Sequence, residues 1–239
     1  MRGKVTQEPS YVIHRRPWRE TSLQVDVFTL NYGRVDLIAR GASASKSPLK
    51  AQLQPFQPLL LDWVGSGGLK TLTQVEVRHA PVLAQSQALF SGFYLNELLQ
   101  RILPAADPYP LLFAAYLDAM AELAAAAELE PVLRRFERSL ALALGYDFAW
   151  DLATDSGAPV QAGWFYGYHP QQGIVERPGA DVRVKKLRGN ALLALAANDY
   201  SDTEARRSAK RVMRALVDYL LQGRPLHSRQ LFIQSGAVK

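Results

Sequence analysis

The sequence predicts an α+β protein in which a small N-terminal β-barrel is followed by an α-helical domain. Short stretches of alternating apolar and polar residues, separated by glycine turns, fill about residues 1–80. From Pro81 onward the apolar residues recur with the helical period of about 3.6. Apolar residues make up 48% and charged residues 21% of the 239 residues, which is typical of a soluble globular chain long enough for two domains.

The first predicted strands form a hairpin. Residues 11–14 indicate a short strand that Pro17 closes, because a proline favours extended structure before it and donates no hydrogen bond. Residues 23–28 alternate as a half-buried strand, and Gly33 suits the positive φ of the following turn. Residues 34–40 are then the partner strand.

The next segment completes a closed barrel. Residues 42–48 are a polar loop, residues 57–64 are an apolar run, and the glycines of residues 65–68 make a turn into a strand over residues 69–77. Four or five short twisted strands in about 80 residues suit an OB-fold, the barrel of this size most used to bind nucleic acid. We therefore expect an OB-fold nucleic-acid-binding domain over residues 1–80.

Helices are predicted in the remainder, residues 81–239. The first ends at Pro104, because a proline breaks a helix interior. The second covers the alanine-rich residues 111–127. The third has Pro131 in its first turn and ends at Gly145, and residues 187–197 form a short helix.

The last long helix has the clearest boundaries. The Ser-Asp-Thr-Glu run at residues 201–204 is a capping box, and Gly223 marks the end of the helix. Arg207, Arg211 and Arg214 align on one exposed face. By contrast, the aromatic and glycine-rich residues 146–183 predict only a small irregular insert, with a short hairpin around residues 164–168 as one interpretation.

Charge is unevenly distributed along the chain. Residues 1–80 hold eleven Lys and Arg against six Asp and Glu, a net charge of +5. Residues 81–180 hold five against eleven, net −6, and residues 181–239 hold twelve against five, net +7. Basic ends around an acidic middle predict two separate sites for acidic or polyanionic partners. The total of +6 alone would also fit a mixed surface without function.

The usual catalytic and metal-binding motifs are missing from the sequence. The absence of cysteine excludes disulfides, thiolate zinc sites and cysteine nucleophiles. The glycines before Lys70 do not form a phosphate loop, because Leu69 intervenes and a strand follows. Asp151 and Asp155 have no supporting histidine and are better explained as solvated or capping residues. We therefore expect no enzyme activity, no cofactor and no metal.

The same reading predicts a cytoplasmic protein. Asp118 and Glu122 interrupt the longest apolar region, which is therefore a packed helix and not a membrane span. Residues 1–10 lack the apolar core of a signal peptide. Association with the nucleoid would follow from DNA binding.

Eight short runs, spread in order along most of the chain, carry a family resemblance. They are residues 16–23 (RPWRETSL), 28–29 (FT), 33–35 (GRV), 39–42 (ARGA), 53–59 (LQPFQPL), 95–99 (LNELL), 133–137 (LRRFE) and 226–232 (LHSRQLF). Together they resemble the RecO family of bacterial DNA repair proteins. The resemblance implies an OB-fold followed by a helical domain, in a recombination mediator that binds single- and double-stranded DNA and anneals complementary strands.

The resemblance also implies protein partners. Such proteins act with RecR, and with RecF in some settings, to load the RecA recombinase onto strands coated by single-stranded DNA-binding protein. Many members bind zinc through four cysteines in the segment equivalent to residues 146–183. This chain has no cysteine, so packing must hold that segment instead.

A basic groove on the barrel is the predicted DNA contact. With six or more phosphate contacts, affinity would fall about 10³–10⁵-fold between 50 and 200 mM salt. Trp18 would either stack on a base or cap the barrel, and packing is favoured slightly. The loop after Gly41 and Ala42 contributes a single cation, Lys46, which weakens the prediction that this loop contacts DNA. The candidate DNA-binding residues are Arg15, Arg16, Arg19, Arg34, Arg40, Lys46, Lys50 and Lys70.

The resemblance places a second site on the helical domain, for the acidic, phenylalanine-ending tail of single-stranded DNA-binding protein. Arg134 and Arg207 are the central cations, with Lys210 and Arg211 as neighbours. Leu133 and Phe136 would wall a hydrophobic pocket for the phenylalanine, or would be interior core residues instead.

Two other function classes stay open. A structural adaptor would use the barrel and the helices for protein contacts alone, and its DNA binding would be weak and insensitive to salt. A nuclease would need a carboxylate cluster for Mg²⁺, which the sequence does not show.

Overall fold

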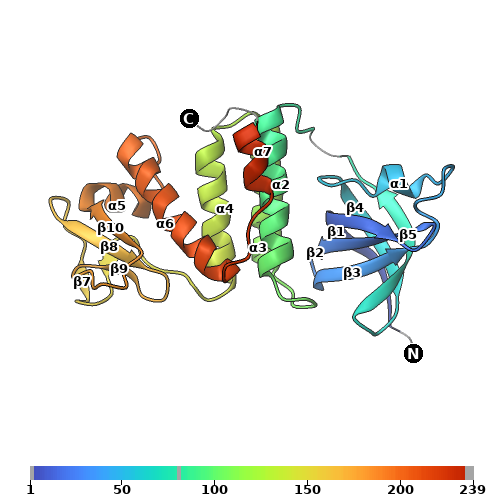
Figure 1. Cartoon of the computed structure of the whole chain (residues 1–239), viewed down its shortest axis with the longest axis horizontal. Coiled ribbons are helices and arrows are strands. Elements are labelled where there is room, and N and C mark those ends of the chain that lie inside the picture. Colours follow the sequence, from blue (N-terminus) through green and yellow to red (C-terminus); the bar gives the residue numbers. More distant parts are fainter. Residues whose placement is uncertain (1–2, 80–81, 235–239) are drawn as a thin grey trace. The chain divides into compact units, whose positions relative to one another are not determined.

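The computed structural model describes residues 3–79 and 82–234 (Figure 1). The chain forms two compact units: the first comprises Met1–Ala127 and Leu226–Lys239, and the second comprises Glu128–Pro225. These units divide the chain at a different place from the predicted boundary near residue 80, because the first two long helices fall in the first unit. The boundary at residue 80 stays a prediction.

A closed barrel opens the first unit. Its strands are β1 (Lys4–Trp18), β2 (Ser22–Thr29), β3 (Gly33–Ala39), β4 (Pro58–Val64) and β5 (Leu69–Val77), joined in the order β1-β2-β3-β5-β4. Only β3 and β5 run parallel among these pairs of described strands. This is the five-stranded OB-fold barrel, so the predicted fold class is confirmed.

β1 is much longer than the predicted strand at residues 11–14. Its 15 residues pair with both β2 and β4, and Pro17 lies inside the strand opposite Leu23 instead of closing it. The register shifts between Val12 and His14 and again between Val5 and Glu8. Such bulges bend a strand, which lets one long strand close the barrel on both sides.

β2 is buried on both faces, where the alternating pattern predicted a half-buried strand. Val25 and Val27 face the barrel interior. On the other face, Phe28 packs against Phe113 with ring centroids 5.3 Å apart, and Asp26 accepts a hydrogen bond from Gln100. Helices therefore cover part of the outer surface of the barrel.

Those helices are α2 (Ser86–Ile102) and α3 (Pro110–Ala124), which begins with its proline in the first turn as helices often do. Tyr116 donates a 2.6 Å hydrogen bond to Asn96, whose amide donates in turn to the carbonyl of Val12. Two short helices, α1 (Leu49–Gln52) and α7 (Ser228–Gln234), were not predicted.

The second unit combines helices with small sheets. The helices are α4 (Leu129–Ala143), α5 (Gly189–Ala196) and α6 (Thr203–Leu221). β8 (Phe165–His169) is central in a three-stranded sheet with β9 (Gly173–Val175) and β10 (Val184–Arg188), and β6 (Leu152–Ala153) pairs with β7 (Ala158–Pro159). Contrary to the prediction, residues 146–183 are not irregular, and the third strand of their sheet, β10, begins just after them at Val184.

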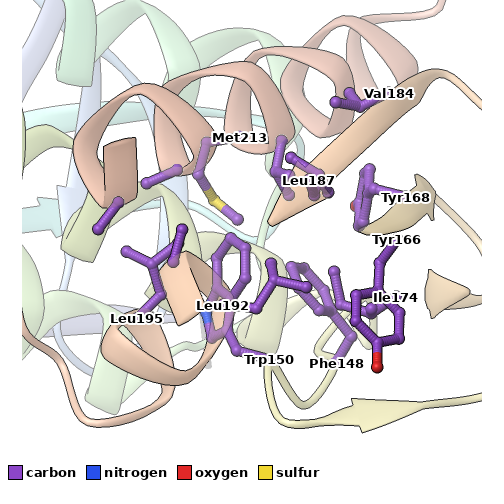
Figure 2. Packing of buried hydrophobic residues seen from close by; sticks show 14 of the residues in the cluster. Phe148, Trp150, Tyr166, Tyr168, Ile174, Val184, Leu187, Leu192, Leu195 and Met213 are labelled. Atoms are coloured by element: carbon purple, nitrogen blue, oxygen red, sulfur yellow. The ribbon is translucent and has the colours of Figure 1, made fainter. Parts of the chain in front are cut away.

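Aromatic packing holds this insert together, as Figure 2 shows. Phe148 lies 4.8 Å from the ring of Trp150 and 4.9 Å from the ring of Tyr168. Leu187 of β10 and Met213 of α6 belong to the same buried cluster. The core of the second unit thus joins the sheet to the helices without a cysteine.

The ends of α6 lie close to the predicted positions. Asp202, not Ser201, is the N-cap, and its carboxylate accepts a hydrogen bond from the backbone N–H of Ala205. Gln222 and Gly223 both take left-handed conformations at the end of the helix. Among the described residues, no helix combines the length and apolar composition needed to cross a bilayer.

Candidate nucleic-acid interface

An open pocket of about 590 Å³ lies on the barrel, where the ends of β1 and β3 meet the starts of β2 and β5. In an OB-fold, the face of strands 2 and 3 and the loops after strands 1 and 4 are the usual place for oligonucleotides. The pocket is lined by Trp18, Arg19, Thr21, Ser22, Ile38, Arg40, Gly41, Leu69, Lys70 and Thr71.

Strand register brings these residues together. Trp18 pairs with Ser22 across the first hairpin, and Ile38 pairs with Thr71 across the parallel strands. Arg19 takes a left-handed φ of 55° in the loop between β1 and β2. That conformation costs a non-glycine residue about 1 kcal/mol, so the surrounding structure must hold the backbone of this loop in place.

Three of the predicted cations meet Trp18 in this pocket. Arg19 and Arg40 are exposed, and Lys70 is half-buried. Trp18 is half-buried beside them and does not belong to the buried core of the barrel. Trp18 is thus partly open to solvent in the pocket, and its role in stacking or packing stays a prediction.

Two predicted cations serve the fold instead. The guanidinium of Arg15 donates to the carbonyls of Lys50 and Leu53 and to the side chain of Gln54, so it closes the end of α1. The Nε atom of Arg34 donates to the carbonyl of Leu103 at the end of α2. The guanidinium of Arg34 also lies 3.6 Å from the carboxylate of Asp36, so both arginines have partners within the fold.

The remaining predicted cations surround the pocket or lie further away. Arg16 is exposed and donates to Gln24, which pairs with the pocket residue Ile38 on the same outer face. Lys46 and Lys50 are exposed in the loop before α1 and in α1, and neither lines the pocket. Of these three cations, Arg16 is the one that the strand register connects to the pocket.

A pair of carboxylates modifies the charge beside the pocket. Burial and the neighbouring charge of Asp26 raise the pKa of Asp36. Burial alone would also raise the pKa of Asp26, but hydrogen bonds from His14 and Gln100 hold it below its ordinary value. Asp36 pairs with Leu69 of the pocket. The local charge therefore becomes more positive as Asp36 takes up a proton.

Sequence reasoning missed the apolar part of the pocket. Ile38 shares the outward register of Arg34 and Asp36 in β3, and Leu69 is 44% exposed at the start of β5. The signal for Ile38 was present in the alternation of β3. Leu69 could not be placed without the parallel pairing of β3 with β5.

The predicted tail-binding residues separate into interior and surface residues. Leu133 and Phe136 are 8% and 1% exposed, so they are core residues and not walls of an open pocket. Arg134 is also buried and lies 3.0 Å from the carboxylate of Glu137, one turn along α4. These three lie on the buried side of the helix, which the apolar stripe of α4 could have indicated.

The predicted cations of α6 remain at the surface. Arg207, Lys210 and Arg211 are all exposed. The ammonium of Lys210 lies 2.6 Å from Glu130, and Arg211 donates to the carbonyl of Lys185. Within the part of the chain that the structure describes, no group of three or more His, Cys, Asp or Glu residues is placed to hold a metal ion.

Comparison with known proteins gives matches to two family models, one for each part of the chain. The model of the recombination protein O N terminal matches residues 1–81, and that of the recombination protein O C terminal matches residues 84–230. The chain is 62% identical to the DNA repair protein RecO of Marinobacter nauticus, over 99% of this chain and 97% of that one. It is 43% identical to the DNA repair protein RecO of Haemophilus influenzae strain Rd, over 94% of each chain.

Proposed function

Because this chain belongs to the RecO family of DNA repair proteins, we propose that it binds single- and double-stranded DNA and anneals complementary strands as a recombination mediator. The family assigns the chain to DNA repair and recombination. The observation that supports direct DNA binding is the barrel pocket, where Arg19, Arg40 and Lys70 surround Trp18.

The proposed mechanism uses two contributions. Cations at the pocket edge neutralise phosphates and release counterions, which gives affinity that depends on salt but not on sequence. Trp18 offers its ring to an unstacked base, a contact worth about 1–3 kcal/mol. A single strand provides both contacts most readily, since its bases are not stacked within a duplex.

Annealing then requires no catalytic group. Two strands held on basic protein surface repel each other less and have a higher local concentration. Base pairing supplies the free energy, so the reaction needs neither a nucleotide nor a metal cofactor. The proposed activity is accordingly not enzymatic.

We further propose that the exposed cations of α6 contact the acidic tail of single-stranded DNA-binding protein. Arg207, Lys210 and Arg211 present positive charge on one helix. A tail carboxylate would replace Glu130 as the partner of Lys210, which costs little because an exposed ion pair contributes only about 0–1 kcal/mol. Leu133, Arg134 and Phe136 would support α4 from inside. RecR, and RecF in some settings, would act with the complex in the cytoplasm at the nucleoid to load RecA.

An annealing assay tests the DNA part of this proposal. Complementary oligonucleotides are mixed with the protein in EDTA and without ATP, and duplex formation is followed by fluorescence. We expect acceleration that declines steeply with salt. Arg19→Ala/Arg40→Ala should slow annealing strongly, whereas Arg78→Ala should not. Arg78 follows the last residue of β5, is exposed and pairs with Glu76. No acceleration by the wild-type protein would refute the proposed function.

A separate binding assay tests the tail site. An acidic peptide ending in phenylalanine is titrated with wild-type protein, Arg207→Ala/Lys210→Ala and the control Arg177→Ala. Arg177 is an exposed cation of the same unit that lies outside α6. Weaker binding by the double variant alone supports the proposal, and equal binding by all proteins contradicts it.

A further inference from the structure

Two neighbouring aromatic side chains of the second unit are open to solvent. Trp164 and Phe165 are each 56% exposed, although the neighbouring Tyr166 and Tyr168 lie in the buried cluster. Arg188 pairs with Phe165 in the sheet, and its guanidinium carbon lies 5.6 Å from the centre of the Phe165 ring. An arginine at this distance makes a cation–π contact with the ring.

Strand alternation explains why these side chains point outward. Tyr166 and Leu187 are paired on adjacent strands and enter the interior, as Figure 2 shows. Phe165 and Arg188, one position away on each strand, must therefore lie on the opposite face. Further along β8 that face is covered, because a Cβ atom on Gly167 would lie 2.7 Å from Val182. Phe165 lies beyond this cover.

The backbone around the two rings is firmly held. The backbone N–H of Trp164 donates to the carbonyl of Gln161, and the backbone carbonyl of Trp164 accepts from the N–H of Gly189. A Cβ atom on Gly189 would lie 1.9 Å from the carbonyl oxygen of Gln161, so the loop and the strand end are in close contact. A rigid backbone reduces the entropy lost when a ligand binds to exposed rings.

The charge beside the rings is uniformly positive along the chain. β10 carries Lys185, Lys186 and Arg188, all exposed, and exposed Arg183 precedes it. No Asp or Glu occurs between Asp181 and Asp199. The register of β10 against β8 shifts between Val184 and Leu187, where Lys186 takes a φ of 59°. This irregularity leaves two consecutive lysines at the surface.

We infer that Trp164 and Phe165 form a base-stacking contact for single-stranded DNA, with Lys186 and Arg188 as its phosphate partners. The inference rests on the proposed DNA-binding function and adds a site on the other unit. Flat exposed rings beside cations fit unstacked bases on a phosphate chain. An acidic peptide ending in phenylalanine has a single ring to place, whereas successive unstacked bases match two adjacent rings, and a duplex keeps its bases stacked away from them. Two sites on one chain would allow it to hold two strands.

The direct test measures affinity for a fluorescent oligothymidine and for a duplex of equal length, using the full chain. Trp164→Ala/Phe165→Ala should bind the single strand about tenfold more weakly and the duplex unchanged. Trp164→Phe, which keeps a ring, should retain most of the affinity. The control Leu142→Ala removes a side chain that is 57% exposed in the same unit and should bind normally.

Intrinsic fluorescence gives a second measurement that keeps both rings in place. Trp63 and Trp150 are 1% and 2% exposed, so in a Trp18→Phe protein the exposed indole is that of Trp164. Oligothymidine should quench this signal. Absence of quenching, or quenching by an acidic peptide in place of the oligonucleotide, would overturn the inference.

The variants also separate this inference from the proposed function. Wild-type affinity of Trp164→Ala/Phe165→Ala, together with a loss in Arg19→Ala/Arg40→Ala, would refute the second site and leave the barrel site standing. Unchanged affinity in both double variants would refute both assigned sites, whereas the proposed function itself fails only if the wild-type protein does not accelerate annealing.

Discussion

The carboxylate of Glu97 accepts hydrogen bonds from the backbone N–H and the hydroxyl of Ser228, at 2.8 and 2.6 Å, across 131 residues of sequence. The backbone N–H of His227 and the guanidinium of Arg101 donate to its other oxygen. Glu97 of α2 thus caps the start of α7 from another helix, where a negative charge is favourable. This contact joins the C-terminal helix to the first unit.

Glu97→Gln should destabilise the protein by about 2 kcal/mol, because it removes the charge from several charge-assisted hydrogen bonds. Denaturant unfolding would measure the loss. Glu76→Gln is the matched control, since the side chain of Glu76 on β5 is 42% exposed and has exposed Arg78 as its ion-pair partner. Equal stability of the Glu97 variant and the wild type would show that the cap contributes little.

The stability that Glu97 contributes should depend on pH. Burial would raise the pKa of Glu97, but the hydrogen bonds from Ser228 and His227 lower it below its ordinary value of 4.5. A carboxyl whose pKa is lowered by folding stabilises the protein above its unfolded pKa and loses that effect as pH falls through its folded pKa. The stability difference between wild type and Glu97→Gln should therefore shrink below about pH 4.5. Unfolding curves at neutral and acidic pH would show it.

The sequence predicted the barrel but not this cap, and the reason is physical. Alternation and glycine turns are local signals, so the strands of the OB-fold could be read along the chain. The contact between Glu97 and Ser228 depends on tertiary structure, and α7 is too short to have a clear period. The long β1 was underestimated because Pro17 suggested an end, whereas the bulges that accommodate the strand have no sequence signature.

The candidate site was predictable by residue type and not by role. Arg15, Arg34, Arg40 and Lys70 are equivalent as charges in a basic segment. In the structure the first two donate to backbone carbonyls and the last two line the pocket. For Arg15 the reason is the register of β1, which places it opposite Val25 on the inner face. Leu133 and Phe136 were open to both interpretations, and burial in α4 makes them core residues.

Because their roles differ, substitution of two arginines of the barrel should affect different properties, DNA binding in one case and stability in the other. Arg40→Ala should lower the salt dependence of DNA binding, by about 0.7 in the slope of log affinity against log salt for a single strand. Arg15→Ala should leave that slope unchanged and lower stability instead, since it leaves the carbonyls of Lys50 and Leu53 without its guanidinium. Salt titrations and denaturant unfolding of both variants would distinguish the roles. A reduced slope in Arg15→Ala would return it to the DNA interface.

Asp36 should make DNA binding stronger at lower pH. Burial and Asp26 raise the pKa of Asp36, and bound phosphate would raise it further. By linkage, affinity increases as pH falls through this pKa, because the complex binds the proton more tightly. Asp36→Asn should bind oligothymidine about threefold more tightly at pH 7 and with a flatter pH profile. The control Glu76→Gln, on the same barrel, should keep the wild-type profile.

The cysteine-free insert should depend on close packing at Gly167. A Cβ atom there would lie 2.7 Å from Val182 and 2.8 Å from Pro178, both in the segment that covers β8. Gly167→Ala should therefore cost about 1–3 kcal/mol through overpacking. Gly163→Ala is the matched control, because its added Cβ would have nothing within 4 Å. Thermal unfolding should separate the two variants.

Removal of metal ions should not affect the insert. EDTA should leave the thermal unfolding transition of the wild-type protein unchanged, because the aromatic cluster around Phe148 and Tyr168 holds the strands in place. A transition that falls with EDTA would show that a metal contributes after all.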